Sequence, residues 1–160
     1  MKIAGFWLGV MLMLNTGGAW AQDAFAVRDP KKVYAEEGNG VIRGQALLRQ
    51  RNGGVVTCAG NDVFLYPDLA EFEDIIQAAH AKQSPAPMTP EQMAVVKAGR
   101  CDALGEFHFS GLPLLSYVVV TNVSWRVGYF QQGGALRQKV TAKEGEGERT
   151  ILSDQDMFGR

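Results

Sequence analysis

The chain has 160 residues and a formal net charge of −1, and 46% of its residues are hydrophobic. The near-neutral balance provides neither a basic face for nucleic acid nor a polybasic segment for anionic lipid, so we expect no nucleic-acid partner. The 19 glycines and 6 prolines are typical of a turn-rich β protein rather than a helical one.

Residues Met1–Ala21 have the pattern of a secretory signal peptide. Lys2 supplies a small positive region, Ile3–Leu14 an apolar core, and Ala19-Trp20-Ala21 a small-x-small cleavage site. An uncleaved membrane anchor is the alternative, but this apolar core is shorter than the roughly 20 residues of a spanning helix. We therefore expect cleavage after Ala21, no membrane span afterwards, and a periplasmic or secreted protein. Cleavage removes only Lys2 among the charged residues and leaves 15 basic and 17 acidic residues.

The mature chain is long enough for one domain, which we expect over residues 40–160. Residues 22–39 show little periodicity and predict a partly ordered lead-in, with loops at 29–32 and 36–40. Val41–Arg49 is the first predicted strand. Asn52-Gly53 follows it and is a strong hairpin signal, because both residues tolerate a positive φ. Further extended segments are predicted at 55–57 and 63–66.

The hydrophobic period then changes to that of a helix. A stripe from Leu69 to Ala79 at offsets of three and four predicts a first helix, with Asp68 as its N-cap. Thr89-Pro90-Glu91-Gln92 has the arrangement of a capping box and predicts a second, short helix that ends near Ala98, before Gly99. Together they predict a helical insert over residues 68–100.

The central stretch, Cys101–Val120, predicts a turn, a strand, a corner and a second strand. Phe107 and Phe109 alternate with residues of the opposite face, as Tyr117 and Val119 do further on. Gly111-Leu112-Pro113 interrupts the alternation, since proline cannot donate to a central ladder. The second strand continues towards Arg126. Residues 127–134 predict a loop, residues 136–142 a half-buried strand with a basic outer face, and residues 149–152 the last strand.

This central stretch resembles the carboxypeptidase regulatory-like domain, a β-sandwich of the prealbumin (transthyretin-like) type. Three consecutive features resemble the family's pattern: a turn that ends at Gly105, the motif Phe107-x-Phe109-x-x-Leu112-Pro113, and then Tyr117-x-Val119. Two earlier segments, Gly40–Ala46 and Val63–Pro67, are similar to the family's first two strands. The family usually has glycine just before the tyrosine strand, where this chain has Leu114-Leu115-Ser116. The resemblance implies an all-β, Greek-key-like sandwich of seven strands that carries the insert, and it implies little about function.

The two cysteines, Cys58 and Cys101, lie at the flanks of the predicted insert. In an exported chain two cysteines most simply form a disulfide, here across a loop of 43 positions. A metal pair or two reactive thiols are the alternatives, but the chain has no C-x-x-C motif and neither cysteine has an adjacent histidine.

The histidines are the main candidates for catalysis. His108 has Asp102 and Glu106 near it in sequence, and an unrecognised enzyme site around these three residues stays open as an alternative. A metal site would also require His80, without the expected ligand spacing, so we predict no metal and no cofactor. The transthyretin-like hydroxyisourate hydrolases carry a C-terminal Tyr-Arg-Gly-Ser motif, which this chain lacks. The sequence therefore favours a protein that is not an enzyme.

Two groups of apolar residues are candidate binding surfaces. Trp125 on its strand is typical of a core residue, but if it is exposed beside Tyr129 and Phe130 the three would suit a carbohydrate or cell-wall ligand. The insert carries more apolar surface than two short helices can bury against each other, so it either packs on a sheet or faces a partner. Its candidates are Phe72, Ile75, Ile76, Met88 and Met93. The sequence predicts a binding or structural module of the bacterial cell envelope, whose partner is an envelope protein or a glycan.

Overall fold

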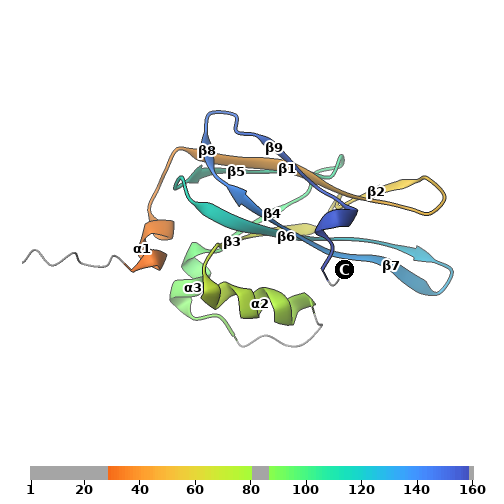
Figure 1. Cartoon of the computed structure of the whole chain (residues 1–160), viewed down its shortest axis with the longest axis horizontal. Coiled ribbons are helices and arrows are strands. Elements are labelled where there is room, and N and C mark those ends of the chain that lie inside the picture. Colours follow the sequence, from red (N-terminus) through yellow and green to blue (C-terminus); the bar gives the residue numbers. More distant parts are fainter. Residues whose placement is uncertain (1–28, 81–86, 159–160) are drawn as a thin grey trace, which may run out of the picture.

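The computed structural model describes residues 29–80 and 87–158 as an all-β sandwich of nine strands with small helices (Figure 1). The predicted signal peptide, Met1–Ala21, lies outside these residues. No helix in the described ranges is long and apolar enough to cross a membrane. The strands are β1 (Gly40–Arg49), β2 (Val55–Thr57), β3 (Asp62–Pro67), β4 (Lys97–Arg100), β5 (Glu106–Leu112), β6 (Ser116–Val127), β7 (Phe130–Thr141), β8 (Lys143–Glu144) and β9 (Arg149–Leu152).

Two sheets form the sandwich. In the first, β1 pairs with β2, β5 and β8, all antiparallel, and with β9 in parallel. The second has the order β4-β3-β6-β7 and is antiparallel throughout. The all-β sandwich is confirmed, but the number of strands is nine rather than seven. Short pairing segments such as β4 and β8 account for the difference, because so few residues give no readable alternation in sequence.

The core lies between the inner faces of the two sheets. The predicted first strand is present as β1, and from Gly40 to Leu48 its residues alternate between buried and half-buried. Phe107 and Phe109 on β5 are buried, and so are Tyr117 and Val119 on β6. Thr121 is a buried polar residue on the same face of β6, and its hydroxyl donates to the Asp62 carbonyl at 2.8 Å. The buried hydroxyl group of Thr121 is therefore hydrogen-bonded, as buried polar groups usually are.

The helical insert covers the outer face of the second sheet (Figure 1). Its helices are α2 (Ala70–His80) and α3 (Pro90–Val95). Phe72 of α2 lies 6.1 Å, centroid to centroid, from the ring of Tyr66 on β3. The predicted capping box is present, since Thr89 Oγ1 accepts from Gln92 N and Gln92 Oε1 accepts from Thr89 N. The insert therefore forms a second hydrophobic layer, between its helices and the outer face of the second sheet.

Three local predictions are corrected. The first insert helix begins at Ala70, and Asp68 instead pairs with Lys139 on β7. The second ends at Val95, and the segment predicted as its end is strand β4, paired with β3. Residues 127–134 are not a loop, because β6 and β7 form one long hairpin with only residues 128 and 129 between the strands.

The lead-in also contains ordered structure. Helix α1 (Pro30–Ala35) begins where a loop was expected, with Asp29 as N-cap and Pro30 in the first turn. Tyr34 is buried, its ring lies edge-on to Tyr117 at 5.1 Å, and its hydroxyl donates to the Ser116 carbonyl at 2.7 Å. This part of the lead-in therefore packs on the sandwich.

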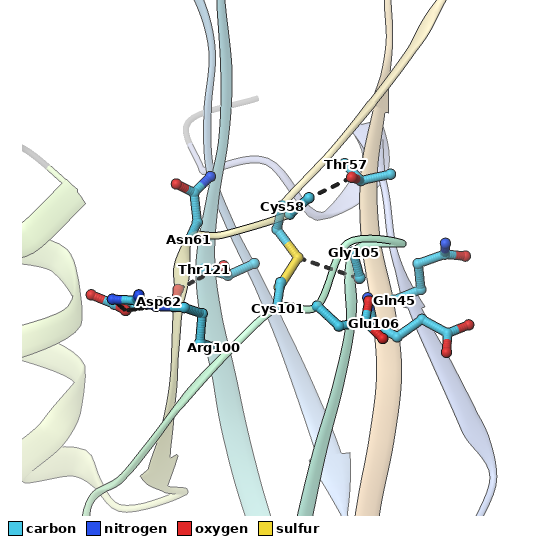
Figure 2. Close-up of a disulfide and its surroundings, with 12 residues drawn as sticks. Gln45, Thr57, Cys58, Asn61, Asp62, Arg100, Cys101, Gly105, Glu106 and Thr121 are labelled. Atoms are coloured by element: carbon cyan, nitrogen blue, oxygen red, sulfur yellow. Dashed lines mark hydrogen bonds and ion pairs between the residues drawn. A yellow bond between two sulfur atoms is a disulfide. The ribbon is translucent and has the colours of Figure 1, made fainter.

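Cys58 and Cys101 form a disulfide with their Cα atoms 5.8 Å apart, as predicted (Figure 2). Cys58 lies between β2 and β3, and Cys101 between β4 and β5, so each cysteine lies on a connection from one sheet to the other. Backbone hydrogen bonds from Gly60 N to Cys101 O and from Cys101 N to Asn61 O hold the two connections side by side. The bond therefore joins two of the connections that run from one sheet to the other.

Candidate functional site

Two hairpin tips lie at the same end of the sandwich (Figure 1). The β1–β2 tip is the Asn52-Gly53 turn that the sequence predicts. Gly53 has φ +88°, Gln50 N donates to the Gly54 carbonyl at 2.7 Å, and Asn52 Oδ1 accepts from Gly54 N at 3.1 Å. These bonds fix the turn, so its side chains are presented on a rigid base.

The β6–β7 tip presents the aromatic residues. Trp125 and Val127 share one face of β6, and on β7 they are opposite Gln132 and Phe130. Gly133 makes this arrangement possible: it has φ +87°, and a Cβ there would lie 2.1 Å from the Val123 carbonyl oxygen and 3.1 Å from Trp125 Cζ3. The indole ring therefore lies close to a stretch of β7 backbone that has no side chain.

A surface pocket of about 460 Å³ lies between the two tips. Its apolar part comes from Trp125, Val127 and Phe130, and Phe130 is 74% exposed. Its polar part combines amides and one guanidinium, from Gln50, Arg51, Asn52 and Gln132. Trp125 is half-buried, so the body of its ring packs on the core while the rest faces the pocket. We call these seven residues the tip pocket.

The tip pocket brings together two of the three aromatic residues predicted as a binding group. Trp125 and Phe130 line it, whereas Tyr129 lies in the turn beside it and is fully exposed. No pattern in the sequence distinguishes the other five lining residues as site residues: Gln50, Arg51, Asn52, Val127 and Gln132. The Asn-Gly turn was a readable signal for the first hairpin, but its position beside Trp125 depends on how the two sheets pack.

Aromatic and amide side chains together suit a ligand with both apolar and hydroxylated faces. The face of an aromatic ring carries partial negative charge and attracts polarised C–H groups. Amide groups donate and accept hydrogen bonds, so each can serve a ligand hydroxyl group. A surface pocket that combines aromatic rings with amide groups is therefore suited to a sugar ring.

The residues around His108 line a different cleft, of about 440 Å³, to which β1, β5 and β9 of the first sheet and Arg100 of β4 contribute. His108 is exposed and lies opposite Arg43 on β1. Asp102 Oδ1 accepts from the backbone N–H of Leu104 and of Glu106, both at 2.8 Å, and the Glu106 carboxylate pairs with Arg149. Both carboxylates therefore have structural partners, and neither is held against the histidine by a hydrogen bond among the described residues.

Among the side chains that the structure describes, no group of three or more histidine, cysteine or acidic residues could hold a metal ion. His80 is the last residue of α2, and its side chain lies outside the part that the structure describes.

The insert residues predicted as a binding surface fall into two groups. Phe72 and Ile76 are buried against the second sheet, which corrects their assignment, because neither side chain can reach a partner. Ile75 and Met88 are half-buried against the same cluster, and only Met93 is largely exposed, at 54%. The insert packs as core and leaves one methionine outside, so it has no continuous apolar face of these five residues.

No protein-family model matches this sequence, and neither does any curated protein. Among solved structures, the fold is similar to a crystal structure from Pseudomonas aeruginosa that is described as a "putative carbohydrate binding protein". The two structures superimpose with a TM-score of 0.60 at 21% sequence identity, over 74% of this chain and 90% of that one. At this level of identity the similarity shows a common fold.

Proposed function

We propose that the protein is a carbohydrate-binding module whose ligand occupies the tip pocket. The observation that carries the proposal is the exposed face of Phe130 beside Trp125, in a pocket whose other side chains are mostly amides. A sugar ring would stack on the aromatic side chains, and its hydroxyl groups would bond to Gln50, Asn52 and Gln132. The description of the Pseudomonas aeruginosa protein agrees with this ligand class.

A catalytic role at the His108 cleft has less support. The carboxylates of Asp102 and Glu106 already serve the turn and the Arg149 ion pair. A general acid or base would need one of these groups free and close to a reacting atom.

Alanine substitution of Phe130 tests the proposal. Phe130 is largely exposed, so F130A should leave the unfolding midpoint almost unchanged and weaken glycan binding about tenfold or more, as for a central aromatic contact. L114A is the matched control, because Leu114 is an exposed apolar residue outside the pocket. Isothermal titration against a panel of oligosaccharides is the measurement. Equal affinities for F130A and wild type would overturn the site, and no binding by wild type to any glycan would overturn the function.

The proposal places the module in the cell envelope. Export would follow from the predicted signal peptide, and the Cys58–Cys101 disulfide fits an oxidising compartment. The resemblance to the carboxypeptidase regulatory-like domain stays a prediction about the family. Mass spectrometry of the exported protein should find Gln22 as the first residue, and retention of residues 1–21 would contradict it.

A further inference from the structure

The two hairpins that carry the tip pocket contain basic side chains and no acidic ones. The chain as a whole has a net charge of −1, yet residues 47–61 and 107–143 contain no aspartate or glutamate. Three arginines lie in or beside the two tips: Arg49, Arg51 and Arg126. Such separation of charge on a nearly neutral protein favours a ligand that carries negative charge.

Arg51 is the arginine that lines the pocket. Among the described residues no carboxylate forms an ion pair with it, whereas Arg43, Arg100, Arg137 and Arg149 each have one. Its guanidinium therefore has donors available for a ligand.

Asn52 beside it also faces the pocket as a donor. Its Oδ1 already accepts from Gly54 N at 3.1 Å, so the NH₂ group of the amide is the part left for a ligand. The β1–β2 side of the pocket thus presents a guanidinium and two amides, and the β6–β7 side presents the aromatic rings with the Gln132 amide. A guanidinium across the pocket from aromatic rings matches a sugar that bears an acidic group.

We infer that the tip pocket binds an acidic glycan, and that Arg51 pairs with the carboxylate of a uronic acid residue stacked on Phe130 and Trp125. The inference rests on the proposed function and adds the class of ligand to it. A planar guanidinium can bond a carboxylate through two parallel N–H groups, which makes the contact selective as well as attractive.

The test compares each glycan with its uncharged form on the full-length protein. The probes are hexasaccharides of galacturonic, glucuronic and mannuronic acid, each with its methyl ester, which keeps the sugar backbone and removes the charge. The variant is R51Q. The control is R126Q, because Arg126 is an exposed arginine of the same end that points to the opposite face of β6 from Trp125 and does not line the pocket.

We expect at least one acid form to bind about tenfold more tightly than its ester at low salt, as for a hydrogen bond to a charged group. R51Q should remove that preference while its affinity for the ester stays within about twofold, and R126Q should keep the preference. Esters that bind wild type as tightly as the acids would overturn the inference and leave the proposed function intact. Equal losses in R51Q and R126Q would overturn the assignment to Arg51, and a wild type that binds neither form of these or any neutral glycan would refute the proposed function itself.

Discussion

Tyr117 shows how one side chain joins three parts of the chain. It is buried on the inner face of β6, its ring contacts Tyr34 of the lead-in helix, and its hydroxyl donates to the Pro113 carbonyl at 3.3 Å. Burial, and to a smaller extent the neighbouring Tyr34, raises the pKa of Tyr117 to about 12. The phenol therefore stays neutral in the folded protein at a pH where the unfolded chain loses the proton.

This shift predicts a loss of stability in alkali. An unfolded tyrosine has a pKa near 10. The stabilisation that the buried, neutral phenol of Tyr117 gives the fold is therefore fully present below about pH 10, and it is lost as the pH rises towards 12. Between pH 10 and 12 the free energy of unfolding of wild type should fall more than that of Y117F, by on the order of 2 kcal/mol. Urea unfolding at several pH values measures it. Parallel pH profiles for the two proteins would contradict the burial argument.

Helix α2 is held on the sheet by charge as well as by apolar contact. The two guanidinium nitrogens of Arg137 on β7 donate to the two carboxylate oxygens of Glu73, at 2.5 and 2.8 Å. Asp68 pairs with Lys139 on the same strand, and Lys31 of α1 pairs with Glu71. The basic outer face of β7, which the sequence predicts, thus holds the acidic side of the insert.

The Glu73 pair predicts a dependence on acid pH. The Arg137 hydrogen bond, helped by Gln77, lowers the pKa of Glu73, so the pair stabilises the fold above about pH 4.5 and is lost as the pH falls through the lowered pKa. E73Q should cost about 0.5–1 kcal/mol at pH 7 and almost nothing at pH 2. Thermal unfolding at both pH values is the measurement, with D74N, an exposed acid on the same helix, as control. A cost that stays the same at both pH values would mean that charge is not involved.

Regular alternation and capping were readable from the sequence because they depend on neighbours along the chain. Strand β1, the core faces of β5 and β6, and the Thr89 capping box are as predicted. The start of β7 could not be predicted, because its glycines and glutamines show no apolar alternation. Its extended conformation depends on pairing with β6. Helix α1 was missed because Asp29-Pro30 is equally compatible with a turn, and packing of Tyr34 on Tyr117 favours the helix.

In the whole molecule, the disulfide joins two connections between the sheets, β2 to β3 and β4 to β5. It closes a loop of 43 positions, and in the chain-entropy model such a loop stabilises a fold by on the order of 4 kcal/mol. The double variant C58A/C101A should therefore unfold at a clearly lower urea concentration than the oxidised wild type. Thiol titration of denatured, unreduced wild type should find no free thiol, and two free thiols would contradict the bond.

The candidate site was only partly readable, since it depends on this overall packing. Trp125 and Phe130 were identified from residue type, but their partners on the β1–β2 hairpin lie far away in sequence. The insert was ambiguous for the same reason, because the stripe that includes Phe72 and Ile76 fits a buried face and a partner-facing one equally well until the sheet is placed.

Mapping of a bound glycan by NMR tests whether carbohydrate binds in the tip pocket. Backbone amide signals of the ¹⁵N-labelled protein would be followed during titration with whichever hexasaccharide binds most tightly. We predict saturable shifts confined to the two tips, around residues 50–54 and 125–132, with the amides of Arg43, Glu106 and His108 unmoved. Shifts centred on the His108 cleft, or shifts spread over the surface without saturation, would contradict a carbohydrate site in the tip pocket.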